Sequence, residues 1–174
     1  IRDYFSDGSR WGVKIEYLHE KKRLGTAGSL SLLCERPTGP FIVMNADVLT
    51  KINFRDFLDF HIHEQCAATM AIRKYELPMP YGVVEHSGHQ IINVIEKPVQ
   101  EFYVNAGIYL LEHNGLDVIP KNRFFNMTDL FNRLIEKKQK TAAFPVREYW
   151  IDIGHKENLE QANRDLILNK TMSL

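Results

Sequence analysis

The sequence predicts an α/β fold in which a mixed sheet is flanked by helices. Up to about residue 75, apolar segments typical of strands alternate with segments of helical periodicity, as in β-α-β units. Residues 41–44 form a continuous apolar run, which is typical of a parallel strand buried on both faces. Residues 82–95 then show the pattern of an antiparallel hairpin around His86-Ser87-Gly88-His89, so we expect the sheet to be mixed.

Each element has its own local signal. Polar and apolar residues alternate over 13–18, and the glycine-containing segment 24–28 ends that strand pattern before a helix. Asn53 is a suitable cap for a helix whose apolar residues follow at helical spacing. In chain order, strands are expected at 13–18, 41–44, 67–75, 82–85, 90–95, 102–111 and 141–147, and helices at about 29–35, after Asn53, at 127–138 and at about 156–168.

Length and charge exclude several classes of protein. The 174 residues are 44% apolar and 25% charged, and 22 Lys and Arg balance 22 Asp and Glu. We therefore expect one domain over residues 1–174, with no general attraction for nucleic acid or anionic membranes. No apolar run approaches the roughly 20 residues of a membrane helix, so we expect a cytoplasmic protein. Cys34 and Cys66 are expected to be packed thiols, not a disulfide or zinc ligands.

Two aspartates stand where the surrounding pattern is apolar. Asp47 comes just after the strand at 41–44, and Asp152 lies between two isoleucines. Carboxylates placed there are expected to be buried and in need of partners, and two of them brought together are natural ligands for Mg²⁺. A helix cap or a polar turn is the alternative interpretation of each, and the spacing alone leaves both open.

The hairpin strands end on residues that suit a phosphorylated sugar. Glu96 and Lys97 precede Pro98, so an acid and a base lie side by side on a constrained backbone. Lys97 has the charge to bind a phosphate and Glu96 can accept hydrogen bonds from sugar hydroxyls, whereas a solvated surface pair is the alternative. Gly82 and Gly107 lie inside strand patterns and mark bulges or places where a ligand approaches the backbone.

Other chemistries lack their motifs. The sequence contains no G-x-S-x-G, no Cys/His nucleophile pattern and no G-x-G-x-x-G, which disfavours covalent catalysis and dinucleotide binding. His61 and His63 are two residues apart on a predicted helix and do not share a face, so we do not expect them to bind one metal ion.

Seven segments, in this order, resemble the sugar-phosphate nucleotidyltransferases, especially the branch close to the mannose-1-phosphate guanylyltransferases. The resemblance spans nearly the whole chain. It is carried by Phe5-Ser6-Asp7-Gly8-Ser9-Arg10-Trp11-Gly12-Val13, Leu24-Gly25-Thr26-Ala27-Gly28, Met44-Asn45-Ala46-Asp47, Tyr81-Gly82-Val83-Val84-Glu85, Glu96-Lys97-Pro98, Val104-Asn105-Ala106-Gly107-Ile108-Tyr109 and Trp150-Ile151-Asp152-Ile153-Gly154. It implies the Rossmann-like, three-layer nucleotide-diphospho-sugar transferase fold, in which ligands bind outside the carboxyl ends of the strands.

The resemblance also implies a reaction and the residues for it. A nucleotidyl group would pass from a nucleoside triphosphate to a sugar 1-phosphate, giving a nucleotide sugar and pyrophosphate. Asp47 and Asp152 would hold Mg²⁺, and these two with Lys97 would be catalytic. The substrate-binding residues would be Leu24, Gly25 and Thr26 near the nucleobase, with Asn45, Gly82, Glu96, Lys97, Asn105 and Gly107 around the sugar phosphate. A homo-oligomer remains open.

Two departures from the family pattern stand out. Ala46 occupies a position where the family usually has glycine, which adds a methyl group beside the ligand. Members of the family begin with a strand and a glycine-rich, Arg- and Lys-bearing phosphate loop, and no segment here matches it. We therefore expect the chain to be the C-terminal portion of a catalytic domain, with little activity by itself. Two alternatives are open. The first is a nucleotide-sugar-dependent glycosyltransferase, although Asn45-Ala46-Asp47 lacks the Asp-x-Asp motif usual in those enzymes. The second is a non-catalytic subunit that binds nucleotide sugars.

Overall fold

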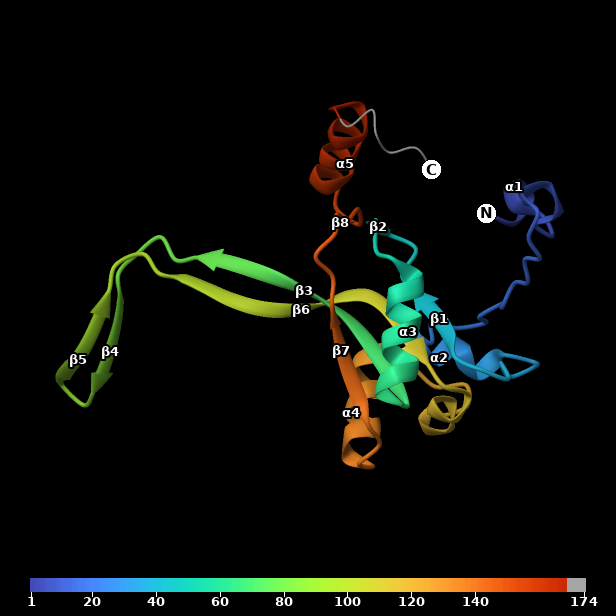
Figure 1. The fold of residues 1–174 in the computed structure, drawn as a ribbon, viewed down its shortest axis with the longest axis horizontal. Helices are drawn as coiled ribbons and strands as arrows, with labels where there is room; N and C mark the ends of the chain where they lie inside the picture. The colour runs from blue at the N-terminus through green and yellow to red at the C-terminus, as the bar shows by residue number, and fades with distance from the viewer. Residues whose placement is uncertain (169–174) are drawn as a thin grey trace.

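A four-stranded mixed sheet forms the centre of the computed structural model, which describes residues 1–168 (Figure 1). Its strand order is β1-β6-β3-β7, with bounds β1 Phe41–Met44, β3 Ala68–Pro78, β6 Val99–Leu111 and β7 Thr141–Pro145. β6 runs antiparallel to both of its neighbours, and β7 runs parallel to β3. The prediction of a mixed sheet is therefore confirmed.

Helices cover both faces of this sheet. Ile108 and Leu110 point to one face of β6 and pack in the cluster that contains Phe57 of α3 (Phe54–Glu64). Tyr109 and Leu111, the alternate residues, pack on the other face with the buried side of α4 (Met127–Glu136). Because side chains alternate along a strand, the two clusters lie on opposite sides of the sheet. The expected three layers are present.

Local sequence signals explain where the helices begin. The Asn53 side chain accepts hydrogen bonds from the backbone N–H groups of Arg55 and Asp56, which caps α3 as predicted. Asn126 and Asp129 form a reciprocal capping box at the start of α4. The remaining helices are α1 Arg2–Phe5, α2 Gly25–Gly28 and α5 Lys156–Leu168, with 3₁₀ turns at Ser9–Trp11, Ser29–Leu32 and His113–Val118. None of the helices within residues 1–168 is long and apolar enough to cross a membrane.

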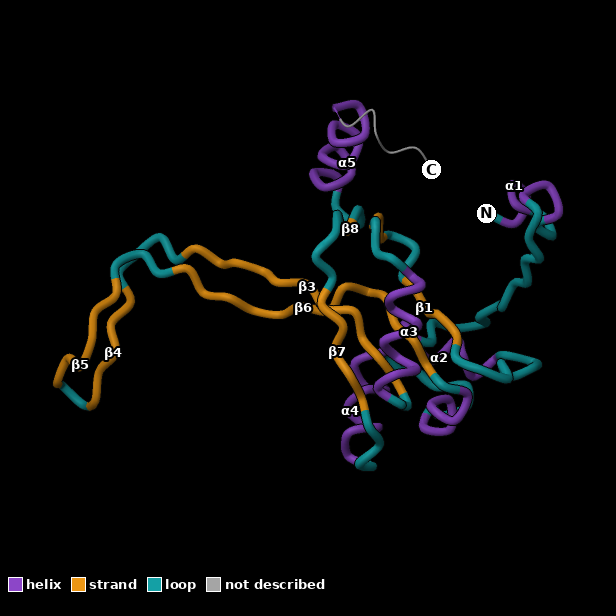
Figure 2. The backbone as a smooth tube through the Cα atoms, in the orientation of Figure 1, coloured by secondary structure: helices purple, strands orange, loops and turns teal. Residues whose placement is uncertain are grey.

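Two small sheets extend from the central one. β2 (Val48–Thr50) pairs with β8 (Trp150–Asp152) next to the start of α5. β3 and β6 continue past the core as a two-stranded ribbon that leads to a hairpin, and we call this whole extension, residues 72–105, the arm. The arm carries the predicted hairpin, β4 (Val83–Ser87) with β5 (Gln90–Ile95), at its far end (Figure 2).

Three expectations about local structure are wrong. Residues 13–18 form no strand, since Val13 and Tyr17 are exposed and no ladder pairs this segment in the part of the chain described. The helix expected at 29–35 is a shorter 3₁₀ turn that ends at Leu32. β1 is an antiparallel edge strand whose Ile42 and Met44 are exposed, so its continuous apolar run does not indicate burial on both faces.

The two cysteines differ in environment. Cys66 is buried as expected, and this burial raises the pKa of its thiol. Cys34 is exposed, so the expectation that it is a packed thiol is wrong. It lies two residues beyond the 3₁₀ turn at Ser29–Leu32, where the shortened helix leaves it at the surface.

Candidate active site

The structure brings together the two aspartates that the sequence singles out. Asp47 immediately precedes β2, and Asp152 ends β8. β2 and β8 pair antiparallel with Val48 opposite Asp152, and the backbone N–H of Ile153 donates to the carbonyl of Asp47 at 2.8 Å. Residues more than 100 positions apart in sequence are therefore fixed side by side by backbone pairing.

Both carboxylates converge on the position of Gly154. A Cβ at this glycine would lie 3.0 Å from Oδ1 of Asp152 and 3.1 Å from Oδ2 of Asp47. The backbone N–H of Gly154 also donates to Oδ1 of Asp152 at 2.8 Å. A glycine at this position therefore leaves free the space that both carboxylates face.

The donor chemistry of this pair suits a hard cation. Asp47 is exposed and Asp152 is half-buried, so the expectation of two buried carboxylates is wrong. β2 and β8 form a small sheet separate from the central one, and both acids keep contact with solvent. Mg²⁺ favours one or two carboxylates while it retains several waters, and a solvent-facing pair of this kind meets that requirement.

A bulge in β6 adjoins the acidic pair. The β3–β6 register shifts between Met70 and Ile72, and Gly107 adopts a left-handed φ of 73° there. Its backbone N–H donates to Oδ1 of Asn105 at 2.9 Å, and its carbonyl accepts from the backbone N–H of Asn45 at 2.9 Å. The structure thus groups Asn45, Asn105 and Gly107 beside the segment of Asp47, and the prediction that Gly107 marks a bulge is confirmed.

Three other predicted residues lie on the arm. Oε2 of Glu96 would lie 2.9 Å from a Cβ at Gly82, and Lys97 follows at an exposed position with a left-handed φ of 44°. Val99 and Asn105, six residues apart on β6, are separated by about 20 Å of extended strand. The structure therefore places the predicted sugar-phosphate residues in two groups at the two ends of the arm. Their assignment to one pocket stays a prediction.

Leu24, Gly25 and Thr26 form a third group, at the start of α4. Gly25 has a φ of 80°, and a Cβ there would lie 2.7 Å from the carbonyl oxygen of Phe125. The Thr26 hydroxyl accepts the backbone N–H of Met127 at 2.8 Å. Leu24 is buried and lines a cavity of about 560 Å³ together with His19, Lys21, Lys22, Ser31, Leu32, Lys121 and Asn122. Nucleobase contact by these three residues stays a prediction.

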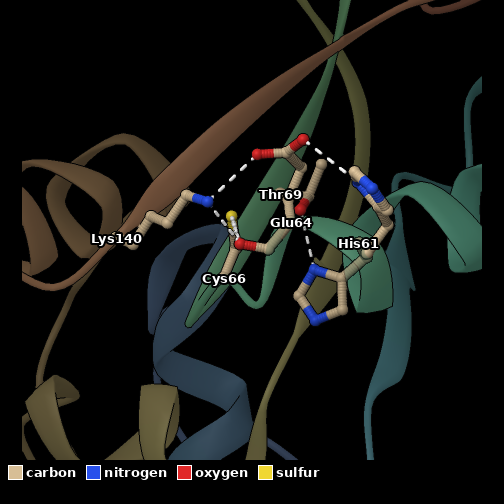
Figure 3. A network of polar contacts seen from close by, with 6 residues as sticks. His61, Glu64, Cys66, Thr69 and Lys140 are labelled. Carbon is tan, nitrogen blue, oxygen red and sulfur yellow. Dashed lines mark hydrogen bonds and ion pairs between the residues drawn. The ribbon is translucent and has the colours of Figure 1, made fainter.

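A polar network around His61 lies at the other end of the sheet. Nδ1 of His61 shares a hydrogen bond of 2.7 Å with the Thr69 hydroxyl, and Lys140 binds the Glu64 carboxylate at 3.0 Å (Figure 3). Burial lowers the pKa of His61, while Glu112, 3.4 Å from Nε2, opposes that shift. His61 is buried and His63 exposed, which confirms that the two do not share a face. The network joins α3 to β3, away from the acidic pair.

Two residues of the site were not assigned a role from sequence. Gly154 leaves room between the carboxylates, and Trp150 donates its indole N–H to the carbonyl of Ala106 at 2.8 Å. Both lie within Trp150-Ile151-Asp152-Ile153-Gly154, where the glycine and the tryptophan flanking an unexpected acid were the available signal.

Comparison with known proteins identifies the family. The family model described as nucleotidyl transferase matches residues 1–168. The chain belongs to the nucleotidyl transferase family. It is 35% identical over 153 residues to mannose-1-phosphate guanyltransferase of Candida albicans and 36% identical over 153 residues to mannose-1-phosphate guanyltransferase beta-A of Xenopus laevis. Each alignment covers 83% of this chain and 42% of the relative, so the chain spans about two-fifths of their length.

Solved structures support the nucleotidyl transferase fold. A Bacillus anthracis protein, provisionally assigned as a glucose-1-phosphate thymidylyltransferase and solved with sucrose, matches with a TM-score of 0.72 at 22% identity. That match covers 99% of this chain and 72% of the other. HddC of Yersinia pseudotuberculosis, complexed with GMP-PN, matches with a TM-score of 0.64 at 22% identity, covering 94% of this chain and 74% of HddC. At this level of identity, the two likenesses support the fold alone.

Proposed function

We propose that the protein carrying this segment transfers a nucleotidyl group from a nucleoside triphosphate to a sugar 1-phosphate, with Mg²⁺ held by Asp47 and Asp152. The observation that carries the proposal is the convergence of both carboxylates on the space at Gly154. Family membership and the mannose-1-phosphate guanyltransferase relatives support the reaction class. Because the chain spans only part of those relatives, the activity is proposed for the whole protein and not for these 174 residues alone.

Each group of site residues has its own role in the proposed reaction. An oxygen of the sugar 1-phosphate would attack the α-phosphorus, and the bond to the β-phosphate would break to release pyrophosphate. Lys97 would bind and orient the sugar phosphate when the far end of the arm is brought to the acidic pair, and Leu24-Gly25-Thr26 would position the nucleobase. Mg²⁺, when bound, would supply positive charge that neutralises the phosphates. Such catalysis depends on positioning and electrostatics and needs no covalent intermediate on the chain.

The substrates can be proposed more narrowly. The relatives at 35% and 36% identity act, by their names, as mannose-1-phosphate guanyltransferases. We therefore choose GTP and mannose 1-phosphate as the first substrate pair to test. Glucose 1-phosphate and thymidine triphosphate form the second pair, since a structural neighbour bears that name.

The test is pyrophosphate release by the whole protein with these substrate pairs. Asp47→Asn and Asp152→Asn should each lower the Mg²⁺-dependent rate at least about 100-fold, because the amide keeps the shape but lacks the charge that binds a hard cation. Asp59→Asn, an exposed acid on α3, is the matched control and should leave the rate unchanged. Full activity in both site variants would contradict the proposal and return the two acids to a structural role.

A further inference from the structure

The two segments that carry the aspartates are both hydrogen-bonded to one bulge on β6. Asn45 donates its backbone N–H to the carbonyl of Gly107 at 2.9 Å. Trp150 donates its indole Nε1–H to the carbonyl of Ala106 at 2.8 Å. Each aspartate follows its donor residue by two positions in the chain. One pair of neighbouring carbonyls therefore anchors both halves of the acidic pair.

The bulge is well suited to act as a fixed anchor. Ala106 is fully buried, and Gly107 lies where the β3–β6 register shifts. The Asn105 side chain accepts the backbone N–H of Gly107, and its own Nδ2 donates to the Tyr109 hydroxyl at 2.8 Å. These hydrogen bonds on both sides of the bulge restrain the two carbonyls.

β8 depends on this anchor more than β1 does. β1 is a strand of the central sheet, with four residues paired to β6. β8 lies outside the central sheet and pairs through three residues with β2, itself a strand of three residues. The indole of Trp150 provides a direct hydrogen bond from β8 to a central strand.

We propose that Trp150 is a positioning residue for the acidic pair, because its indole N–H ties β8 to the bulge and, together with the β2–β8 pairing, holds Asp152 in place beside Asp47. The inference rests on the proposed function, since it concerns the carboxylates assigned there to Mg²⁺. Trp150 also packs against the apolar cluster that contains Phe57 and Ile108, and packing alone is the competing explanation. Replacing the indole N–H while keeping an aromatic ring separates the two roles.

The experiment measures Mn²⁺ affinity directly, by titration of the chain followed by electron paramagnetic resonance, so it does not depend on turnover. Trp150→Phe should weaken Mn²⁺ binding about five- to tenfold, which is the factor that a hydrogen bond of roughly 1 to 1.4 kcal/mol is worth. Tyr149→Phe is the matched control. It removes a hydrogen bond of the same length, from the Tyr149 hydroxyl to Asp165 at 2.8 Å, but this bond leads to α5 and not to the bulge. It should change the affinity less than twofold.

A second variant tests the same hydrogen bond if Trp150→Phe is poorly folded. Benzothienylalanine at position 150 retains both fused rings and replaces the N–H with sulfur, so packing is preserved while the donor is lost. The same five- to tenfold loss would support the inference. Affinity within twofold of the parent chain, while Asp47→Asn and Asp152→Asn no longer bind Mn²⁺, would overturn it and leave the proposed function intact. Undiminished binding by both asparagine variants would overturn the metal site itself, and the inference with it.

Discussion

The two ends of strand β6 carry different kinds of candidate site residue. From Ala106 to Leu111 every residue of the strand is buried, and this end adjoins the acidic pair. From Val99 to Tyr103 every residue is exposed, and this end leads to Glu96 and Lys97 on the arm. The core end is positioned by contacts between segments distant in sequence, whereas the arm end is held by one ribbon of two strands (Figure 1).

This difference has an energetic basis. The core end of β6 packs apolar side chains on both faces, and such burial contributes about 1.5 to 3 kcal/mol for each large side chain. A two-stranded ribbon that buries little is only marginally stable by itself. The geometry at Asp47 and Asp152 is therefore a property of the folded core, while the position of Lys97 depends on what the arm contacts.

The largest expected effect is on the free energy of unfolding, when a glycine with a positive φ is replaced by alanine at the core end of β6 and, for comparison, on the arm. Gly107→Ala places a side chain at a φ of 73°, and its Cβ would lie 2.9 Å from Nδ2 of Asn45. We expect it to lower the free energy of unfolding by about 2 to 4 kcal/mol. Gly88→Ala, at a φ of 57° in the hairpin turn with no atom within 4 Å, should cost about 1 kcal/mol. Urea denaturation measures both, and equal losses would show that the core end is no more constrained than the arm.

Lys97→Met tests whether the arm contributes to the proposed site. The substitution keeps most of the length and apolar packing of the side chain but removes the charge. If Lys97 binds the sugar phosphate, kcat/KM for that substrate should fall about 10- to 150-fold, as expected for a charge-assisted hydrogen bond of roughly 1.5 to 3 kcal/mol. Steady-state kinetics of the whole protein provide the measurement. A change below twofold, with unaltered thermal stability, would identify Lys97 as a solvated surface lysine.

Gly154→Ala tests the core end alone. Its Cβ would lie 3.0 to 3.1 Å from both carboxylates and should push them apart, which would weaken Mn²⁺ binding about tenfold, or roughly 1.4 kcal/mol. Gly39→Ala is the control, since no atom lies within 4 Å of its Cβ position and its backbone does not have a positive φ. Titration of both variants compares them directly. Equal Mn²⁺ affinity would mean that the space at Gly154 is not where the ion binds.

The smallest effect concerns the pH dependence of core stability. Burial holds the pKa of His61 below the ordinary value of 6.5, so the unfolded chain takes up this proton more readily than the folded one. The stabilisation that comes from keeping His61 neutral is fully present above pH 6.5. It is lost as the pH falls from 6.5 towards the lowered pKa, and the free energy of unfolding then decreases by at most about 1.4 kcal/mol per pH unit. His61→Gln should flatten the stability profile between pH 7 and about 5. His63→Gln, on the exposed face of the same helix, should not, and identical profiles for both variants would contradict this assignment.

Sequence periodicity was sufficient to predict the helices that bury one face. α4 and the capped α3 follow from their apolar spacing and their Asn caps, because those signals act within a few residues. The strand expected at 13–18 shows the limit, since alternation predicts a strand only where another strand supplies hydrogen bonds. Whether such a partner exists is not encoded within those residues.

The candidate site was predictable as a set of residue types but not as a geometry. Asp47 and Asp152 were identifiable because each interrupts an apolar pattern, whereas their juxtaposition follows from the β2–β8 register. The role of Trp150 depends on a hydrogen bond to Ala106, 44 residues away, which no local pattern reveals. The grouping of Gly82, Glu96 and Lys97 with Asn105 came from the family resemblance alone. In the described chain, the length of the arm separates the first three residues from Asn105.

Paramagnetic broadening of backbone amide signals locates bound Mn²⁺ and so tests the metal site at Asp47 and Asp152 directly. We expect low Mn²⁺ concentrations to broaden the amides of Asp152, Ile153 and Gly154 first, since these lie beside the converging carboxylates. The amide of Lys97, at the far end of the arm, should stay sharp, and Asp47→Asn should abolish the broadening at Gly154. Broadening that begins elsewhere, or that persists at Gly154 in both asparagine variants, would contradict the assignment of the acidic pair as the metal site.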